Sequence, residues 1–208
     1  MNVQQFIELL NIGKQIAIEN EEMLCDLDSK NGDGDLGITF RKIMTSLNET
    51  VTKQQFNDLG KLLYIAGGDI TENAASTMGT LFASGIMEAG KQLKGIDELK
   101  NEEFIILFQA LIDGIEKRGK ATRGDKTILD TLYPVVEALT KHVQDTEQQL
   151  FEHALVAAKN GVEATKTLEA KHGRAARYEN KSVGLVDPGS VLAELLVSIF
   201  DKYYKQFS

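Results

Sequence analysis

Apolar residues recur at intervals of three and four along nearly the whole chain, and this spacing limits the fold more than any other feature of the sequence. Phe6, Leu9 and Leu10 follow it near the start, and Phe104 and Leu107 follow it in the middle. Such a repeat places apolar side chains on one face of an α-helix, whereas the alternation of a β-strand is almost absent. The sequence therefore predicts an all-α fold.

Eight helices are expected, separated by glycine-rich or polar connections because the chain has only two prolines. The expected helices run near residues 3–24, 38–48, 54–67, 79–93, 101–117, 126–143, 147–168 and 189–206. No connection is long enough to divide the chain. We therefore expect a single domain, residues 1–208, in which the helices pack as one bundle or barrel.

Composition narrows the classes of function. The chain has 208 residues, of which 42% are hydrophobic, enough for one sizeable core. Its formal charge of -8 argues against a nucleic-acid partner, because no basic stripe could neutralise phosphates. A single cysteine, Cys25, is usual for a reducing compartment, and no apolar stretch approaches the roughly 20 residues of a membrane span. We expect a cytoplasmic protein that does not bind membranes.

Four polar or glycine-rich connections form one candidate site. They read "DSKNGDGDLG", "ENAASTMG", "KRGKATRGDKT" and "KHGRAARYENKSVGLVDPG", and they follow the first, third, fifth and seventh expected helices. In an up-and-down bundle, alternate connections lie at the same end. The organisation of the chain therefore predicts that the four connections meet there.

The first connection carries three aspartates, Asp28, Asp33 and Asp35, separated by glycines that let the backbone curl. Carboxylate oxygens suit Mg²⁺, which keeps positions for substrate phosphates, and the following helix offers free N–H groups to an anion. The alternative is an exposed acidic turn with Asp35 or Thr39 near a helix N-cap. An EF-hand is disfavoured, because Thr39 stands where that motif has its closing glutamate.

The second and third connections offer groups for phosphate. In "NAASTMG", Ser76 and Thr77 carry hydroxyls that could bind phosphate, although capping of the next helix is the favoured role of either residue alone, and the two roles can coexist. "RGKATRGDKT" contains four cations that could hold polyphosphate, and an aspartate, Asp125, placed to cap the helix expected from residue 126. The alternative is a solvated basic loop. The four cations are Arg118, Lys120, Arg123 and Lys126.

The fourth connection contains "HGRAAR", with Arg174, and "DPG", typical of a cap followed by proline at the first helical position. His172 precedes the arginine, and a structural role is favoured for it. His142 and His153 fall on expected helices and are interpreted as surface residues. No spacing places a nucleophile beside a base, so the sequence does not support covalent catalysis.

These motifs together resemble the nucleotide-binding L subunits of dihydroxyacetone kinase. The matching blocks are "GDGDLGITF", "STMGTLFASGIMEAGK", "RGKATRGDKTILDTLYPV" and "GRAARYENKSVGLVDPGS", in the family's order and over nearly the whole chain. The resemblance implies a barrel of eight antiparallel helices with ADP or ATP and Mg²⁺ at one end.

The resemblance also implies roles for particular residues. Asp28, Asp33 and Asp35 match the family's metal ligands, and Arg174 matches the arginine that would stabilise the transferred phosphoryl group. The remaining matches are implied nucleotide contacts: Gly37, Ile38, Thr39, Ser76, Thr77, Met78, Gly119, Ile128, Asp187, Pro188 and Gly189. The chain departs from many family members at Leu36, Lys181 and Leu185.

In the family, a separate K subunit binds the ketone, and in the bacterial phosphotransferase-linked version a phosphorylated M subunit recharges ADP to ATP on the L subunit. The resemblance implies the same partners here, with a small ketose on the K subunit. Three alternatives stay open: a kinase subunit for another ketose, the nucleotide domain of a fatty-acid kinase, and a non-catalytic adaptor with the same fold. The sugar and the oligomeric state do not follow from the sequence.

Overall fold

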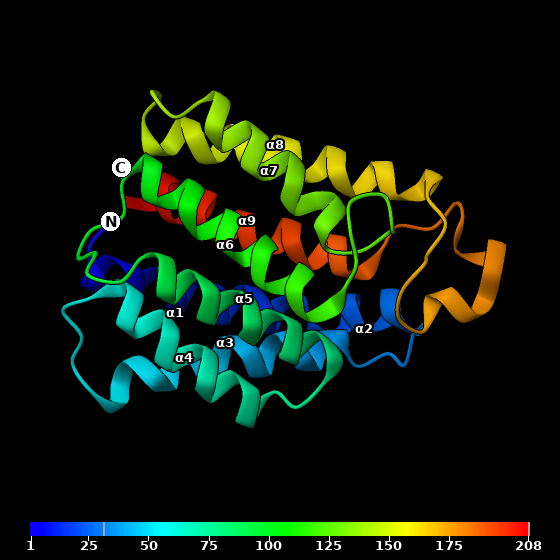
Figure 1. The fold of residues 1–208 in the computed structure, drawn as a ribbon, viewed down its shortest axis with the longest axis horizontal. Helices are drawn as coiled ribbons and strands as arrows, with labels where there is room; N and C mark the ends of the chain where they lie inside the picture. The colour runs from blue at the N-terminus through cyan, green and yellow to red at the C-terminus, as the bar shows by residue number, and fades with distance from the viewer. Residues whose placement is uncertain (31, 208) are drawn as a thin grey trace. The chain divides into compact units, whose positions relative to one another are not determined.

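The computed structural model describes residues 1–30 and 32–207, and for residues 178–181 the backbone alone. Within these residues it contains nine α-helices, two 3₁₀-helices and no β-strand (Figure 1). Asn2 and Glu98 form an isolated antiparallel bridge. The all-α prediction is confirmed. No helix among the described residues is long and apolar enough to cross a membrane.

The helices are α1 (Val3–Glu19), α2 (Glu21–Ser29), α3 (Leu36–Lys53), α4 (Leu59–Asn73), α5 (Thr77–Gln92), α6 (Asn101–Gly119), α7 (Leu129–Lys141), α8 (Glu147–Ala164) and α9 (Pro188–Phe207). The 3₁₀-helices η1 (Thr165–Thr167) and η2 (Ala175–Ser182) lie between α8 and α9. The chain divides into two compact units: Met1–Ile18 with Thr39–Lys120, and Glu19–Ile38 with Ala121–Ser208. The expectation of one domain stays a prediction.

The first expected helix is broken in two. Asn20 leaves the helical conformation, with φ -108° and ψ 7°, and separates α1 from α2. Asparagine competes for backbone hydrogen bonds through its side chain and is a poor residue for a helix interior. Glu21 and Glu22 then occupy the first turn of α2, where acidic side chains favour a helix start. The expected range 3–24 was therefore wrong at its end, and the helix count was one too low.

The first unit is held together by α4, α5 and α6, which pack in sequence (Figure 1). Side chains from α3, α4 and α6 are fully buried in its core, among them Phe40, Leu62 and Phe104. Removing apolar surface from water is the main favourable contribution to such a core.

The second unit is built on α7, α8 and α9, which pack on one another, while α2 packs on α9. Its core includes Leu24 of α2 and a stacked pair, Phe151 of α8 and Phe200 of α9, whose ring centroids lie 4.7 Å apart. This unit carries the first and fourth connections and the part of the third connection from Ala121 onward.

Candidate functional site

The aspartate connection is folded around the side chain of Asp28, the last acidic residue of α2. Its Oδ2 atom accepts hydrogen bonds from the backbone N–H groups of Gly34, at 2.9 Å, and Asp35, at 3.1 Å. Gly34 has φ +74°, a conformation that favours glycine. The glycine-rich sequence therefore lets the loop turn back on Asp28 before α3 begins.

The turn gathers the three predicted metal ligands. One carboxylate oxygen from each of Asp28, Asp33 and Asp35 lies within 4.8 Å of the others. Gly37 lets the first turn of α3 approach α2 closely, because a Cβ atom there would lie 2.0 Å from the carbonyl oxygen of Glu21 on α2. Three carboxylates this close repel one another unless a cation lies among them. Oxygen-only ligands of this kind suit a hard divalent cation.

Arg174, from the fourth connection, is the cation beside this cluster. Its Nη2 atom lies 2.8 Å from Oδ2 of Asp33, and 60% of its side chain is exposed. This ion pair joins the first connection to the fourth within the second unit. Because the side chain is exposed, its planar guanidinium is accessible to a ligand. A guanidinium can bind two phosphate oxygens at once.

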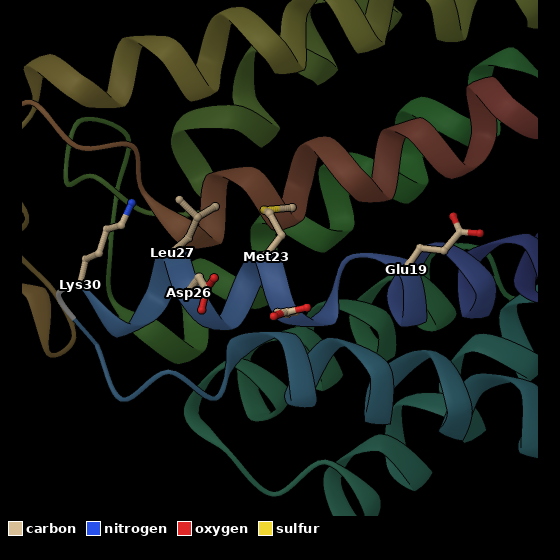
Figure 2. Close-up of a pocket in the computed structure, with 6 residues that line it drawn as sticks. Glu19, Met23, Asp26, Leu27 and Lys30 are labelled. Carbon is tan, nitrogen blue, oxygen red and sulfur yellow. The ribbon is translucent and has the colours of Figure 1, made fainter.

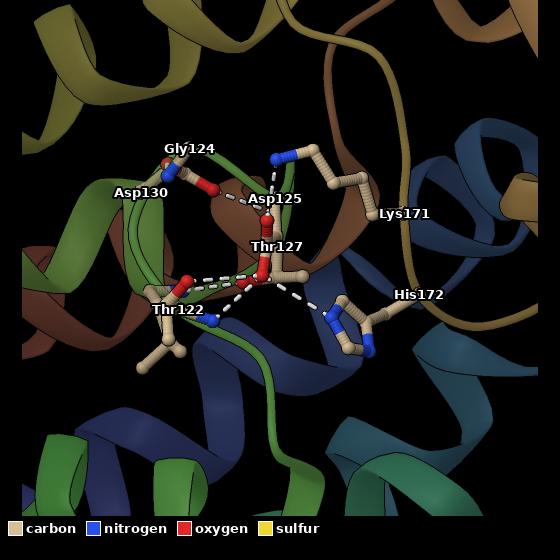
Figure 3. Close-up of polar contacts among 8 residues, drawn as sticks. Thr122, Gly124, Asp125, Thr127, Asp130, Lys171 and His172 are labelled. Atoms are coloured by element: carbon tan, nitrogen blue, oxygen red, sulfur yellow. Dashed lines mark hydrogen bonds and ion pairs between the residues drawn. The ribbon is translucent and has the colours of Figure 1, made fainter.

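A second polar network joins the third connection to the fourth around the buried Asp125 (Figure 3). Its carboxylate accepts hydrogen bonds from the ammonium of Lys171, at 2.8 Å, and the backbone N–H of Thr122, at 2.8 Å, and lies 3.2 Å from Nε2 of His172. The Lys171 ammonium and the Thr122 N–H together hold the pKa of Asp125 well below its usual range. This carboxylate is therefore ionised, and it holds the side chains of Lys171 and His172, which lie three and two residues before Arg174.

The expectation that Asp125 caps the next helix was wrong. Helix α7 begins at Leu129, and the carboxylate of Asp130 accepts the backbone N–H groups of Gly124, at 2.6 Å, and Thr127, at 2.8 Å. Asp125 instead contacts Lys171 and His172 of the fourth connection. The role of Asp130 was not predicted, because a residue inside a helix is rarely expected to bind the backbone of the preceding loop. Its position three residues after Thr127 could have indicated this contact, since aspartate side chains often bind backbone N–H groups a few residues away.

Lys126 is buried and its ammonium binds backbone carbonyls of the protein. The prediction that Lys126 could hold polyphosphate was therefore wrong. The residue is 5% exposed, and its backbone has φ 59°. Burial lowers its pKa, against the opposing effect of the Asp187 carboxyl. The Nζ atom donates to four backbone carbonyls, those of Thr165 at 2.8 Å, Leu168 at 3.2 Å, Ser182 at 2.5 Å and Leu185 at 2.7 Å. Lys126 therefore ties η1 to the end of η2, on either side of Arg174.

The "DPG" turn starts α9 as the sequence predicts. Asp187 accepts the backbone N–H of Ser190 at 2.7 Å, Pro188 is the first helical residue, and Gly189 is buried. The backbone N–H of Asp187 donates to the hydroxyl of Thr165 at 3.0 Å. Burial raises the pKa of Asp187 to about 7, although its bonds with Ser190 favour the charged form. A carboxyl of this kind changes charge near neutral pH.

The second connection lies in the first unit and shows the expected helix start. Ser76 is the N-cap of α5, and its hydroxyl accepts the backbone N–H of Gly79 at 3.0 Å. The hydroxyl of the buried Thr39 donates to the same oxygen at 3.1 Å. Thr77 is exposed and Met78 is partly exposed. The capping alternative is thus confirmed for Ser76, and the structure brings it together with Thr39.

Three further residues that were predicted to contact nucleotide lie in three different environments. Ile38 is 38% exposed, Ile128 is 2% exposed in the core of the second unit, and Gly119 ends α6 in the first unit. A hollow of about 450 Å³ on α2 is lined by none of the predicted site residues (Figure 2). Of the departures from the family pattern, the Lys181 side chain lies outside the described residues. The assignment of nucleotide contacts stays a prediction.

Comparisons with known proteins agree with these motifs. A family model described as "DAK2 domain" matches residues 30–202. The "PEP-dependent dihydroxyacetone kinase 1, ADP-binding subunit DhaL" of Listeria innocua is 33% identical over 188 residues, 90% of this chain and 89% of that protein. The "PEP-dependent dihydroxyacetone kinase, ADP-binding subunit DhaL" of Escherichia coli is 30% identical over 191 residues, 89% of this chain and 90% of that protein.

A solved structure supports the fold. The crystal structure of the dihydroxyacetone kinase of C. freundii in its native form matches with a TM-score of 0.75 at 22% identity and covers 97% of this chain. The match covers 34% of the C. freundii chain, so the present chain spans about a third of that protein's length.

Proposed function

Because the chain belongs to the DAK2 domain family, we propose that it is the ADP-binding subunit of a dihydroxyacetone kinase. Two relatives that carry the name of this subunit align with it over about nine tenths of both chains. The observation that carries the proposal beyond family membership is the cluster of three aspartate carboxylates beside an exposed arginine. Such a cluster is suited to a magnesium-bound polyphosphate.

The donor atoms fit Mg²⁺. Asp28, Asp33 and Asp35 supply oxygen ligands only, and the turn around Asp28 sets the spacing of all three. Nitrogen and sulfur ligands, which would favour other metals, do not belong to this cluster. Bound Mg²⁺ would neutralise the charge on the phosphates, and bound ADP would carry the phosphoryl group between donor and acceptor.

Arg174 has the proposed catalytic role. It lies beside Asp33 on a segment fixed by Asp125 and Lys126, so its guanidinium is positioned next to the site proposed for the phosphates. A fixed positive charge there would stabilise the charge of the transferred phosphoryl group without covalent chemistry. The proposed nucleotide contacts are those that the family resemblance implies: Gly37, Ile38, Thr39, Ser76, Thr77, Met78, Gly119, Ile128, Asp187, Pro188 and Gly189.

The proposal includes two partner proteins. A K subunit would hold dihydroxyacetone, and a phosphorylated M subunit would return a phosphoryl group to ADP on this chain, so that the nucleotide stays bound as a cofactor. The names of both relatives describe a PEP-dependent kinase with an ADP-binding subunit, which supports an activity divided among subunits. An antiparallel barrel of eight helices, in which α1 and α2 count as two parts of one helix broken at Asn20 and the site lies at one end, belongs to the same proposal.

Reconstitution tests this function. The chain would be mixed with a K subunit, a phosphorylated M subunit and dihydroxyacetone, and formation of phosphorylated product would be followed. We expect turnover from the wild type and from Asp26→Asn, which removes an exposed carboxylate of α2 outside the cluster. The double variant Asp33→Asn/Asp35→Asn should lose magnesium-dependent turnover. Turnover with erythrulose but not dihydroxyacetone would favour a different ketose, and equal turnover by all three proteins would refute the site.

A further inference from the structure

The turn between α7 and α8 brings two of the three histidines of the chain together with an aspartate. His142 is the C-cap of α7, and His153 lies on α8. Their rings stack, with centroids 3.7 Å apart and planes inclined by 16°. The sequence alone does not pair them, because eleven positions separate them and both are predicted from it to be surface residues.

Asp145 connects the two imidazoles. Its Oδ2 atom lies 2.9 Å from Nδ1 of His142 and 3.7 Å from Nε2 of His153. One ligand atom from each of the three residues lies within 4.8 Å of the others. The set therefore offers two imidazole nitrogens and one carboxylate oxygen, a combination different from the oxygen-only cluster of the aspartate loop.

The backbone holds these residues in place without a ligand. The N–H of Asp145 donates to the carbonyl of His142 at 2.9 Å, which closes a tight turn. Thr146 then caps α8 together with Gln149, so the start of the helix that carries His153 is fixed. Because α7 and α8 pack against each other, both histidines are attached to the same rigid helix pair.

From this geometry we propose that His142, Asp145 and His153 bind one borderline-soft divalent cation of the Zn²⁺ class. Imidazole nitrogens with a carboxylate suit Zn²⁺, Co²⁺ or Ni²⁺ better than Mg²⁺. Ligand atoms around a tetrahedral zinc lie roughly 3.3 Å apart, given zinc–ligand distances of about 2.0 to 2.1 Å. The site thus has to contract by about 1.5 Å at most, which a rotation of the His153 ring, 49% exposed, can supply.

The proposed site is separate from the aspartate cluster and does not depend on the proposed kinase function. His142 follows the last residue of α7, while Asp125 and Lys126 precede the first. A helix of 13 residues is about 20 Å long. The bound ion would join the C-terminus of α7 to α8 and brace this end of the helix pair.

The test is zinc binding in a large excess of Mg²⁺, which competes with Zn²⁺ for oxygen-only ligands such as those of the aspartate cluster. Titration of the wild type with Zn²⁺, or with Co²⁺ followed by its visible absorption, should show one saturable equivalent with nitrogen ligation. His142→Gln/His153→Gln should lose that equivalent, and Asp145→Asn should weaken it at least tenfold. Circular dichroism would confirm that each variant is folded.

Two matched variants separate this site from the other candidates. His172→Gln removes the third histidine, and Asp33→Asn/Asp35→Asn removes two carboxylates of the aspartate cluster; both should bind Zn²⁺ as the wild type does. The melting temperature of the wild type should rise on addition of Zn²⁺, whereas that of His142→Gln/His153→Gln should not. Equal Zn²⁺ binding by the wild type and the double histidine variant, or no binding by either, would overturn the proposal.

Discussion

Replacing Lys126 by methionine tests how the segment that carries Arg174 is held. The Lys126 ammonium donates to the carbonyls of η1 and of the residues that end and follow η2. Methionine has a similar length but no charge and no N–H donor. The substitution therefore removes this tie while keeping most of the buried apolar stem.

The cost can be worked out from the hydrogen bonds. An ammonium has three N–H donors, so three of the four contacts can be made at full strength at once, each contributing about 1.5 kcal/mol at the lower limit for a charged donor. The Thr165 and Ser182 carbonyls keep a backbone donor, from Leu168 at 3.1 Å and Leu185 at 3.3 Å. The variant also avoids the cost of burying a charge. Both effects reduce the loss below the roughly 4.5 kcal/mol that three such bonds would contribute together. We therefore expect the free energy of unfolding to fall by about 3 kcal/mol.

Urea unfolding followed by circular dichroism would measure this change, and limited proteolysis would show whether residues 165–187 become more accessible. Lys120→Met is the matched control. Lys120 also has a positive φ, 61°, but it is exposed at the C-cap of α6, so its replacement should change stability by less than about 0.5 kcal/mol. Equal stability of the two variants would refute the structural role assigned to Lys126.

Three further changes test other parts of the structure. Burial raises the pKa of Asp187 from 3.8 to about 7, so between these pH values the native state keeps a proton that the unfolded chain loses. The stability of the wild type should therefore fall relative to that of Asp187→Asn as pH rises from 4 to 7. A stability difference in urea unfolding that does not change with pH would contradict this. Ser76→Ala should lower stability by about 1 kcal/mol through loss of the N-cap to Gly79, and Ser76→Asp should restore it, as judged by urea unfolding. Arg174→Lys should lower turnover of the reconstituted kinase about tenfold or more through loss of the planar guanidinium, with ADP binding less affected; unchanged turnover would exclude the proposed role.

The local features of this chain could be predicted from its sequence. The all-α class follows from the apolar repeat, and the caps at Ser76 and Asp187 follow from short-range patterns whose partners lie three residues away. The clustering of Asp28, Asp33 and Asp35 was predicted for the same reason, since a glycine-rich turn of eight positions limits how far apart they can lie.

Features set by long-range packing could not be predicted. Lys126 has the composition of a surface loop cation, and only its burial against carbonyls 39 to 59 positions away shows its structural role. The pairing of Asp125 with Lys171 and the stacking of His142 on His153 likewise depend on segments that the fold brings together. The break at Asn20 was missed because apolar residues resume at Met23 and Leu24, seven residues after Ile16 and Ala17 and therefore on the same face of a continuous helix.

The proposed function requires that this chain bind ADP and Mg²⁺ through the aspartate cluster. The most direct measurement is to purify the wild type without added nucleotide, denature it, identify any released nucleotide by mass spectrometry and measure magnesium in the same sample. We expect near-stoichiometric ADP with magnesium from the wild type and from Asp26→Asn, and neither from Asp33→Asn/Asp35→Asn. A folded wild-type protein that releases no nucleotide and binds neither added ADP nor ATP in the presence of Mg²⁺ would contradict the claim.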